Sequence, residues 1–155
     1  MNTHILDDEV QNFIFNYTEP ATKLAFAGSP FQEISTQALL EQIESRRAIE
    51  KKLPLWFASK KIYYPPKLNL EQTSSEQTAK YKSNLVTGGT LADITGGFGI
   101  DAYYFSKAFK KVTHIEQNNT LSKIARHNAS ILGADAMEFR TGDGLETIST
   151  HRYDV

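Results

Sequence analysis

The stretch Thr90-Leu-Ala-Asp-Ile-Thr-Gly-Gly-Phe-Gly-Ile-Asp-Ala102 indicates how this chain folds. Three apolar residues predict a short buried strand that carries Asp93 near its end: Leu91, Ala92 and Ile94. Gly97 and Gly99 then allow a tight turn in which the backbone can approach a ligand without a Cβ atom in the way. Asp101 is placed to favour the start of a helix, because a carboxylate interacts well with a helix N-terminus. This order of strand, glycine loop and helix is typical of a nucleotide-cofactor site.

Two later segments, 112–116 and 136–141, predict further strands with acidic residues at their carboxyl ends. Glu116 follows the glycines by about 20 residues, which is where an acidic residue reaches the ribose hydroxyls in a βαβ unit. Asp143 follows the third strand and offers only acceptor atoms, which suit an exocyclic amine such as adenine N6. Helical patterns separate the strands, so the sequence predicts an α/β fold with a Rossmann-like parallel sheet and right-handed crossovers.

Two classes of cofactor fit such a site. Gly97, Gly99 and Ala102 match the G-x-G-x-x-A pattern of dinucleotide-binding loops, which keeps an NAD-dependent oxidoreductase as an alternative. A dinucleotide brings a pyrophosphate, which prefers backbone donors and nearby cations, whereas S-adenosylmethionine brings a sulfonium and an ammonium. The segment 93–102 contains no Lys or Arg, and the four charged residues of the predicted site are all acidic: Asp93, Asp101, Glu116 and Asp143. These charges favour S-adenosylmethionine.

Four short segments resemble the first three motifs of class I S-adenosylmethionine-dependent methyltransferases: Leu91-Ala-Asp93, Thr95-Gly-Gly-Phe-Gly99, Ile115-Glu116 and Gly142-Asp143. The chain departs from the common form of the first motif, because Thr95 stands where the first glycine is usual. The resemblance implies that Gly97 and Gly99 line the methionine moiety, that Glu116 holds the ribose and that Asp143 holds the adenine amine. The predicted cofactor site comprises Asp93, Thr95, Gly96, Gly97, Phe98, Gly99, Asp101, Glu116 and Asp143.

Three segments before the glycine loop carry a narrower resemblance: Lys52-Leu-Pro-Leu-Trp56, Ile62-Tyr-Tyr-Pro-Pro66, and Glu71-Gln-Thr-Ser-Ser-Glu76 with Thr78-Ala-Lys-Tyr-Lys82. Together they are similar to bacterial class I methyltransferases that carry a THUMP-like domain later in the chain. That resemblance implies an RNA substrate, because THUMP domains are RNA-binding modules of modification enzymes.

The end of the chain, Tyr153-Asp-Val155, reads as the start of a fourth strand. In many amino-methylating relatives the catalytic motif lies just past that strand, and none of it is present here. We therefore expect an N-terminal fragment that holds most of a cofactor site, lacks catalytic residues and is itself inactive. A sheet interrupted at this point would leave an exposed edge, which favours dimers.

The helical patterns divide the chain into an α-helical region, 1–68, and a truncated S-adenosylmethionine-binding domain, 69–155. Apolar spacing predicts a first helix around Val10, Phe13, Ile14 and Tyr17. A second is predicted from Ser35 or Thr36 through Leu39, Leu40 and Ile43 to Leu53, with Pro54 interrupting it near its end. The capping-box spacing of Thr73 and Glu76 predicts a helix to about Val86, whose start Ser74 and Ser75 would help to satisfy. Later helices are expected over 102–109 and from Asn118 or Asn119 to Gly133.

Composition restricts the setting of this chain. The absence of cysteine excludes disulfides, and the acidic amino terminus has no long apolar stretch, so neither a secretory signal nor a membrane span is expected and the cytoplasm is the expected compartment. The four histidines have no metal-ligand spacing, so no metal site is predicted. The net charge of −1 gives no argument for nucleic-acid binding.

One segment, 41–67, is locally basic and interleaved with aromatic residues. Such a segment could contact RNA phosphates and stack on bases, so a non-enzymatic RNA-binding module is a second alternative. The simpler interpretation is a solvated helix face followed by aromatic side chains that anchor it. We favour this structural interpretation for the segment.

Overall fold

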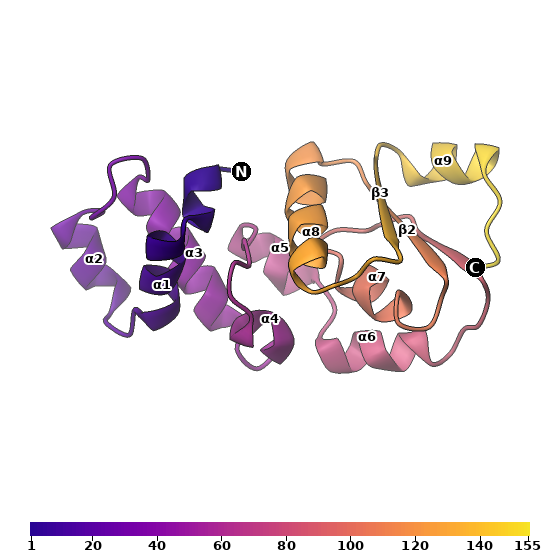
Figure 1. Ribbon diagram of the computed structural model, residues 1–155, viewed down its shortest axis with the longest axis horizontal. Coiled ribbons are helices and arrows are strands. Elements are labelled where there is room, and N and C mark those ends of the chain that lie inside the picture. Colours follow the sequence, from indigo (N-terminus) through magenta and orange to yellow (C-terminus); the bar gives the residue numbers. More distant parts are fainter. The chain divides into compact units, whose positions relative to one another are not determined.

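The computed structural model describes residues 1–155, which form two compact units, 1–71 and 72–155 (Figure 1). The first unit is helical, and the second combines helices with a parallel sheet. None of the helices has both the length and the apolar character that crossing a membrane requires.

The helical unit contains one 3-10 helix and five α-helices: η1 (Thr3–Leu6), α1 (Asp8–Asn16), α2 (Ala21–Ala27), α3 (Thr36–Ala48), α4 (Pro54–Ala58) and α5 (Lys67–Gln72). Its core is a cluster of buried aliphatic side chains: Ile5, Val10, Ile14, Leu24, Ile34, Leu39 and Ile43. The apolar spacing predicted in the first and second helices is confirmed, because these residues supply much of this core.

The second predicted helix is shorter than expected. Ser35 caps it, accepting a hydrogen bond from the Ala38 amide at 3.2 Å, but α3 ends at Ala48 and does not reach Leu53. Leu53 has φ −134° and ψ 65°, outside the helical region, because the residue before a proline is sterically disfavoured there. Pro54 begins α4 instead, at the first helical position, where its missing N–H leaves no hydrogen bond unmade.

The second unit contains three strands and four helices: α6 (Glu76–Ser83), β1 (Thr90–Asp93), α7 (Ile100–Phe105), β2 (Lys111–Glu116), α8 (Asn119–Ile131), β3 (Met137–Thr141) and α9 (Gly144–Thr150). The strands lie in the order β1-β2-β3 and are all parallel. Helices α7 and α8 pack against β2 (Figure 1). The predicted α/β fold with a Rossmann-like parallel sheet is confirmed.

The register of the strands gathers the predicted acidic residues at one edge of the sheet. Asp93 at the end of β1 pairs with His114 of β2, and Glu116 at the end of β2 pairs with Thr141 of β3. Asp143 follows two residues later. The carboxyl ends of adjacent parallel strands therefore place these three carboxylates on the same side of the sheet, where α/β folds bind ligands.

Helix α6 begins later and ends earlier than the sequence indicated. Ser75 is its cap, accepting a hydrogen bond from the Thr78 amide at 3.1 Å, so Glu76 is the first helical residue and not the capping-box partner of Thr73. The Glu76 carboxylate is 5% exposed and accepts a hydrogen bond from the Tyr104 hydroxyl at 2.8 Å. The helix ends at Ser83, with Asn84 as its C-cap.

The last residues of the chain lie along β1, on the edge that β2 does not occupy. The Val155 amide donates to Thr90 O at 3.3 Å and the Ala92 amide donates to Val155 O at 3.0 Å, which is the hydrogen-bond pattern of parallel pairing. The Asp154 carboxylate accepts hydrogen bonds from the Gly89 and Thr90 amides at 2.8 Å, which lowers the pKa of Asp154. These residues pair with β1 as the start of a fourth strand would.

Candidate functional site

The glycine loop between β1 and α7 is folded back onto the end of β2. Gly97 and Gly99 have φ angles of +53° and +87°, which residues with a side chain rarely adopt. Four loop amides donate hydrogen bonds within the protein: Thr95 N to Asp93 Oδ1 at 3.2 Å, Gly96 N to Ile115 O at 2.9 Å, Gly97 N to Glu116 Oε2 at 2.9 Å and Gly99 N to Gly96 O at 2.9 Å. The loop is therefore held in place by the two strands beside it.

His114 of β2 supports this loop from the interior. Its side chain is fully buried, and a Cβ atom added to Gly96 would lie 2.5–2.7 Å from three atoms of its ring. The His114 Nε2 atom lies 3.1 Å from Gly97 O, and because a carbonyl only accepts, Nε2 carries the proton. The sequence assigned no role to this histidine, and the structure shows that it packs directly against the glycine loop of the candidate site.

Glu116 connects the second strand to the loop. Its Oε2 accepts the Gly97 amide at 2.9 Å and its Oε1 accepts the Asn118 amide at 2.8 Å. The residue is half-buried at the carboxyl end of β2. Each carboxylate oxygen has two lone pairs, so both backbone contacts leave capacity for ribose hydroxyls.

Asp143 has a structural role as well as its predicted one. It caps α9, since its Oδ1 accepts the Leu145 amide at 2.7 Å and the Glu146 amide at 3.2 Å. Its Oδ2 accepts a hydrogen bond from the Gln117 side chain at 2.9 Å, which links the ends of β2 and β3. Capping alone is a sufficient reason for an aspartate at this position, and Oδ2 is the atom with capacity left for an amine.

A pocket of about 260 Å³ opens at the carboxyl end of β1. It is lined by Lys82, Leu91, Ala92, Asp93, Ile94, Thr95, Asp101, Phe105 and Val155. Burial raises the pKa of Asp93 above its usual value, and the nearby Asp101 adds to this effect, while His114 opposes it. The pocket therefore presents a desolvated carboxylate beside the glycine loop.

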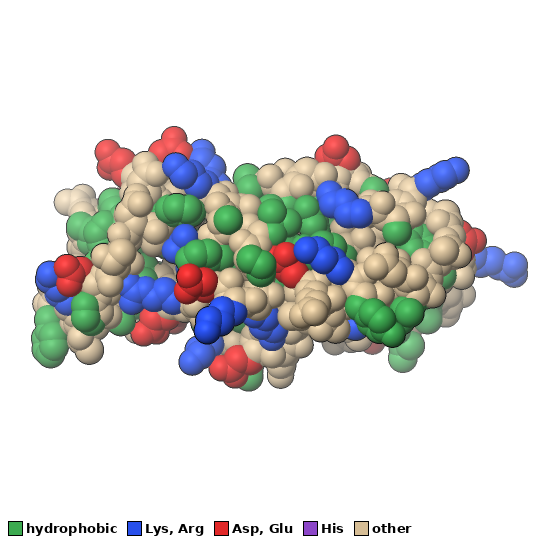
Figure 2. Space-filling model, turned by 90° about the horizontal axis from the view of Figure 1, so that it is seen from below, with side chains coloured by type: hydrophobic (Ala, Val, Ile, Leu, Met, Phe, Trp, Pro, Cys, Tyr) green, Lys and Arg blue, Asp and Glu red, His purple; other side chains and the backbone are tan.

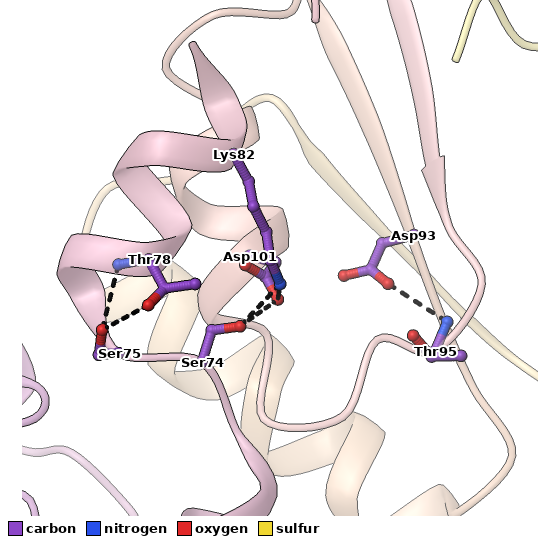
Figure 3. Close-up of polar contacts among 7 residues, drawn as sticks. All are labelled: Ser74, Ser75, Thr78, Lys82, Asp93, Thr95 and Asp101. Atoms are coloured by element: carbon purple, nitrogen blue, oxygen red, sulfur yellow. Dashed lines mark hydrogen bonds and ion pairs between the residues drawn. The ribbon is translucent and has the colours of Figure 1, made fainter. Parts of the chain in front are cut away.

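Asp101 contacts α6 and does not cap its own helix (Figure 3). Its Oδ2 accepts a hydrogen bond from Ser74 Oγ at 2.8 Å and lies 3.0 Å from Lys82 Nζ, which is itself 2.9 Å from Ser74 Oγ. The other carboxylate oxygen, Oδ1, is buried without a hydrogen-bond partner. Ser74 was expected to help satisfy the start of α6, but Ser75 does so alone, and Ser74 belongs to this polar cluster.

The structure brings most of the predicted site residues together. Asp93, Thr95 and Asp101 line the pocket, the loop glycines lie between it and Glu116, and Asp143 follows at the next strand. Phe98 is 3% exposed and does not line the pocket, so its side chain serves the core. Sequence reasoning did not identify Lys82 and Gln117, because both act through neighbours distant in the chain.

Comparison with known proteins gives one informative likeness. No family model and no curated protein matches this chain. Among solved structures, it is similar to a protein named "putative methyltransferase from Porphyromonas gingivalis W83", with 28% sequence identity and a TM-score of 0.79 over 95% of this chain and 37% of that one. A methyltransferase from Geobacter sulfurreducens matches at 18% identity with a TM-score of 0.44, covering 50% of this chain and 42% of the other.

The first likeness covers nearly all of this chain, so it includes the helical unit as well as the sheet unit. This chain spans little more than a third of the length of that protein, at 37%. Together with the three-stranded parallel sheet and its flanking helices, the comparison shows that the fold is a methyltransferase fold.

Proposed function

We propose that this chain carries the cofactor-binding part of an S-adenosylmethionine-dependent methyltransferase. The observation that carries the proposal is the hydrogen bond from the Gly97 amide to Glu116 Oε2 at 2.9 Å. It joins the glycine loop of the first strand to the acidic residue of the second, in the arrangement that holds an adenosine ribose in such folds. When bound, S-adenosylmethionine supplies an activated methyl group.

The loop amides favour S-adenosylmethionine over NAD. A pyrophosphate is held by free backbone N–H groups and by cations. Here the amides of Thr95, Gly96, Gly97 and Gly99 already donate within the protein. With no Lys or Arg in 93–102, the loop suits a cofactor without phosphate, and the oxidoreductase alternative is not favoured.

In this proposal, residues at the ends of three strands each bind a different part of the cofactor. Glu116 binds the ribose hydroxyls, Asp143 Oδ2 accepts the adenine amine, and Gly97 and Gly99 line the methionine moiety. Asp93 offers a carboxylate oxygen to the ammonium group, since only its Oδ1 is used, by the Thr95 amide. In this scheme the chain binds and orients the cofactor, and the acceptor is positioned by residues outside these assignments.

Calorimetric titration with S-adenosylhomocysteine and, separately, NADH tests the proposal. We expect the first to bind and the second not to bind. Glu116→Ala should weaken S-adenosylhomocysteine about 10- to 100-fold, because a hydrogen bond to a charged group contributes about 1.5–3 kcal/mol. Glu138→Ala, which removes an exposed carboxylate from the neighbouring strand, is the matched control and should leave the affinity unchanged. Preference for NADH, or equal losses in the two variants, would contradict the proposal.

We further propose RNA as the methyl acceptor, on the THUMP-like resemblance of the segments between residues 52 and 82. The basic side chains of 41–67 are not the support for this, because Arg46, Arg47 and Lys52 donate to backbone carbonyls within the helical unit. On the face displayed in Figure 2, basic side chains are interspersed with acidic ones. RNA binding that falls steeply with rising salt concentration is the expected result, and salt-independent binding would contradict it.

A further inference from the structure

Lys82 places a cation at the wall of the pocket beside β1, where the predicted motifs supply only carboxylates. Its side chain is 44% exposed, so the ammonium is open to the pocket as well as to its partners. Nζ lies 3.0 Å from Asp101 Oδ2 and 2.9 Å from Ser74 Oγ (Figure 3). An ammonium has three N–H donors, so these two contacts leave one for a ligand.

The contacts of Lys82 are a poor arrangement for stability. A half-exposed ion pair contributes little to folding. Asp101 also has its Oδ1 buried without a partner, which costs folding free energy. Ser74 donates to the same Asp101 oxygen at 2.8 Å and thereby fixes the carboxylate that Lys82 faces. The cluster thus fixes the position of one ammonium group at the wall of the pocket.

The charges around the pocket match the two ends of an amino acid. Asp93 supplies a carboxylate on one wall, and in Figure 3 its second oxygen is turned toward the side occupied by Asp101 and Lys82. Asp101 Oδ2 is already engaged by Ser74 and Lys82, which partly neutralises it. The pocket therefore offers an acceptor for an ammonium group and a donor for a carboxylate.

We propose that Lys82 binds the carboxylate of the amino-acid end of the cofactor, with Ser74 and Asp101 as the positioning residues that hold its ammonium. This inference rests on the proposed function, because it assigns one end of the same cofactor. It adds a residue of α6 to a site that is otherwise built from strand ends. It also predicts that the carboxylate of the ligand, and not only its adenosine, is recognised.

Decarboxylated S-adenosylmethionine, which lacks only this carboxylate, is the discriminating probe. Calorimetry with the two ligands should show that the unmodified chain binds S-adenosylmethionine about tenfold more tightly or better, the size expected of one charge-assisted hydrogen bond. Lys82→Met should abolish that preference by weakening S-adenosylmethionine alone. Lys82→Arg keeps the charge and should retain most of it, while Lys123→Met, an exposed lysine on α8, should change neither affinity.

The positioning role of Ser74 is tested by the same ratio of affinities for S-adenosylmethionine and its decarboxylated form. Ser74→Ala should reduce the preference for the carboxylated ligand while leaving the affinity for the decarboxylated ligand unchanged. A structural role alone would weaken both ligands in parallel, and that result would overturn the assignment.

Other outcomes are equally decisive. Equal binding of the two ligands by the unmodified chain would overturn the role of Lys82 and leave the proposed function standing. Binding of neither ligand, nor of S-adenosylhomocysteine, would overturn the proposed function and the assignment together. A Lys82→Met variant that weakens RNA binding but not the ligand preference would assign this lysine to a phosphate of the acceptor instead.

Discussion

Basic and acidic side chains occur in both units, but they are used differently. In the helical unit the Arg46 guanidinium lies 4.2 Å from the Phe15 ring centroid and 4.0 Å from that of Phe57, and it donates to Phe57 O at 3.1 Å. Arg47 donates to the carbonyls of Tyr17 and Glu19 at 2.8 and 2.7 Å. These cations join helices and loops within the unit, and their contacts are with the protein itself.

In the sheet unit the charged groups of the candidate site keep hydrogen-bonding capacity to spare, and two of them, Asp93 and Lys82, line one pocket. Glu116 uses one lone pair of each oxygen, Asp93 uses one oxygen, and Lys82 uses two of its three donors. The contrast shows that residue type is a poor guide to function. What distinguishes a candidate site is the presence of unused hydrogen-bond donors and acceptors beside a pocket at the ends of the strands.

The largest expected effect tests whether the loop of the sheet unit depends on its close approach to β2. Gly96→Ala places a Cβ atom 2.5–2.7 Å from the ring of the buried His114, which has no open space to move into. We expect the free energy of unfolding to fall by about 3 kcal/mol, the upper range for overpacking a core. Chemical denaturation measures this change, and cofactor binding should be lost as the loop is displaced.

The control for this prediction is Gly133→Ala. Gly133 has φ +64° but no atom lies within 4 Å of an added Cβ, so only backbone strain of about 1 kcal/mol is expected. If the two variants lose the same stability, steric contact with His114 is not what fixes the loop.

A smaller effect is expected from the helical unit, where it separates stability from binding. Arg46→Met removes two cation–π contacts and one hydrogen bond while keeping an unbranched apolar stem, and should lower the free energy of unfolding by about 1–2 kcal/mol. The affinity for S-adenosylhomocysteine should not change. Lys51→Met, at an exposed position, should alter neither quantity. A change in cofactor affinity with Arg46→Met would contradict the view that the cations of the helical unit serve only its own packing.

The sheet was predictable because its pattern is local. Each strand is a short apolar run, each crossover has helical spacing, and the turns carry glycine or asparagine, as at Asn118 and Gly133 around α8. The helix predicted through Leu53 was wrong: apolar spacing continued past Ala48, where α3 ends, and Leu53 itself is kept out of the helical region by the proline that follows it. Local chemistry outweighed periodicity at that point.

The site was predictable only where residues occur in order along the strands. The loop glycines and Glu116 could be aligned with each other through the geometry of a βαβ unit. The contact of Ser74 and Lys82 with Asp101 joins α6 to α7, which β1 separates in the sequence, and the spacing of these residues does not predict it. The packing of Gly96 on the His114 ring is likewise a tertiary contact that the sequence does not predict, since a glycine next to Gly97 is expected to be only one more turn residue.

The smallest expected effect concerns Asp93, the residue at which stability and binding should move in opposite directions. Its pKa in the folded chain is raised, chiefly by burial, so the folded state binds this proton more tightly than the unfolded state. The stabilisation that comes from protonating Asp93 is therefore present at low pH and is lost as the pH rises through the folded pKa. Asp93→Asn removes the ionisation and keeps an oxygen that can accept the Thr95 amide.

Asp93→Asn should thus be more stable than the unmodified chain near neutral pH, and the difference should shrink as the pH falls to about 4, near the ordinary carboxyl pKa. Urea denaturation at the two pH values measures it, with Asp135→Asn, an exposed aspartate, as the control. The same variant should bind S-adenosylhomocysteine more weakly, because the ammonium loses its charged partner. A variant that is less stable at neutral pH would mean that the Asp93 carboxylate is held by favourable contacts, as in the helical unit, and that its charge is structural. Higher stability with weaker binding would mean instead that the fold tolerates a desolvated charge at the end of β1 because the ligand needs it.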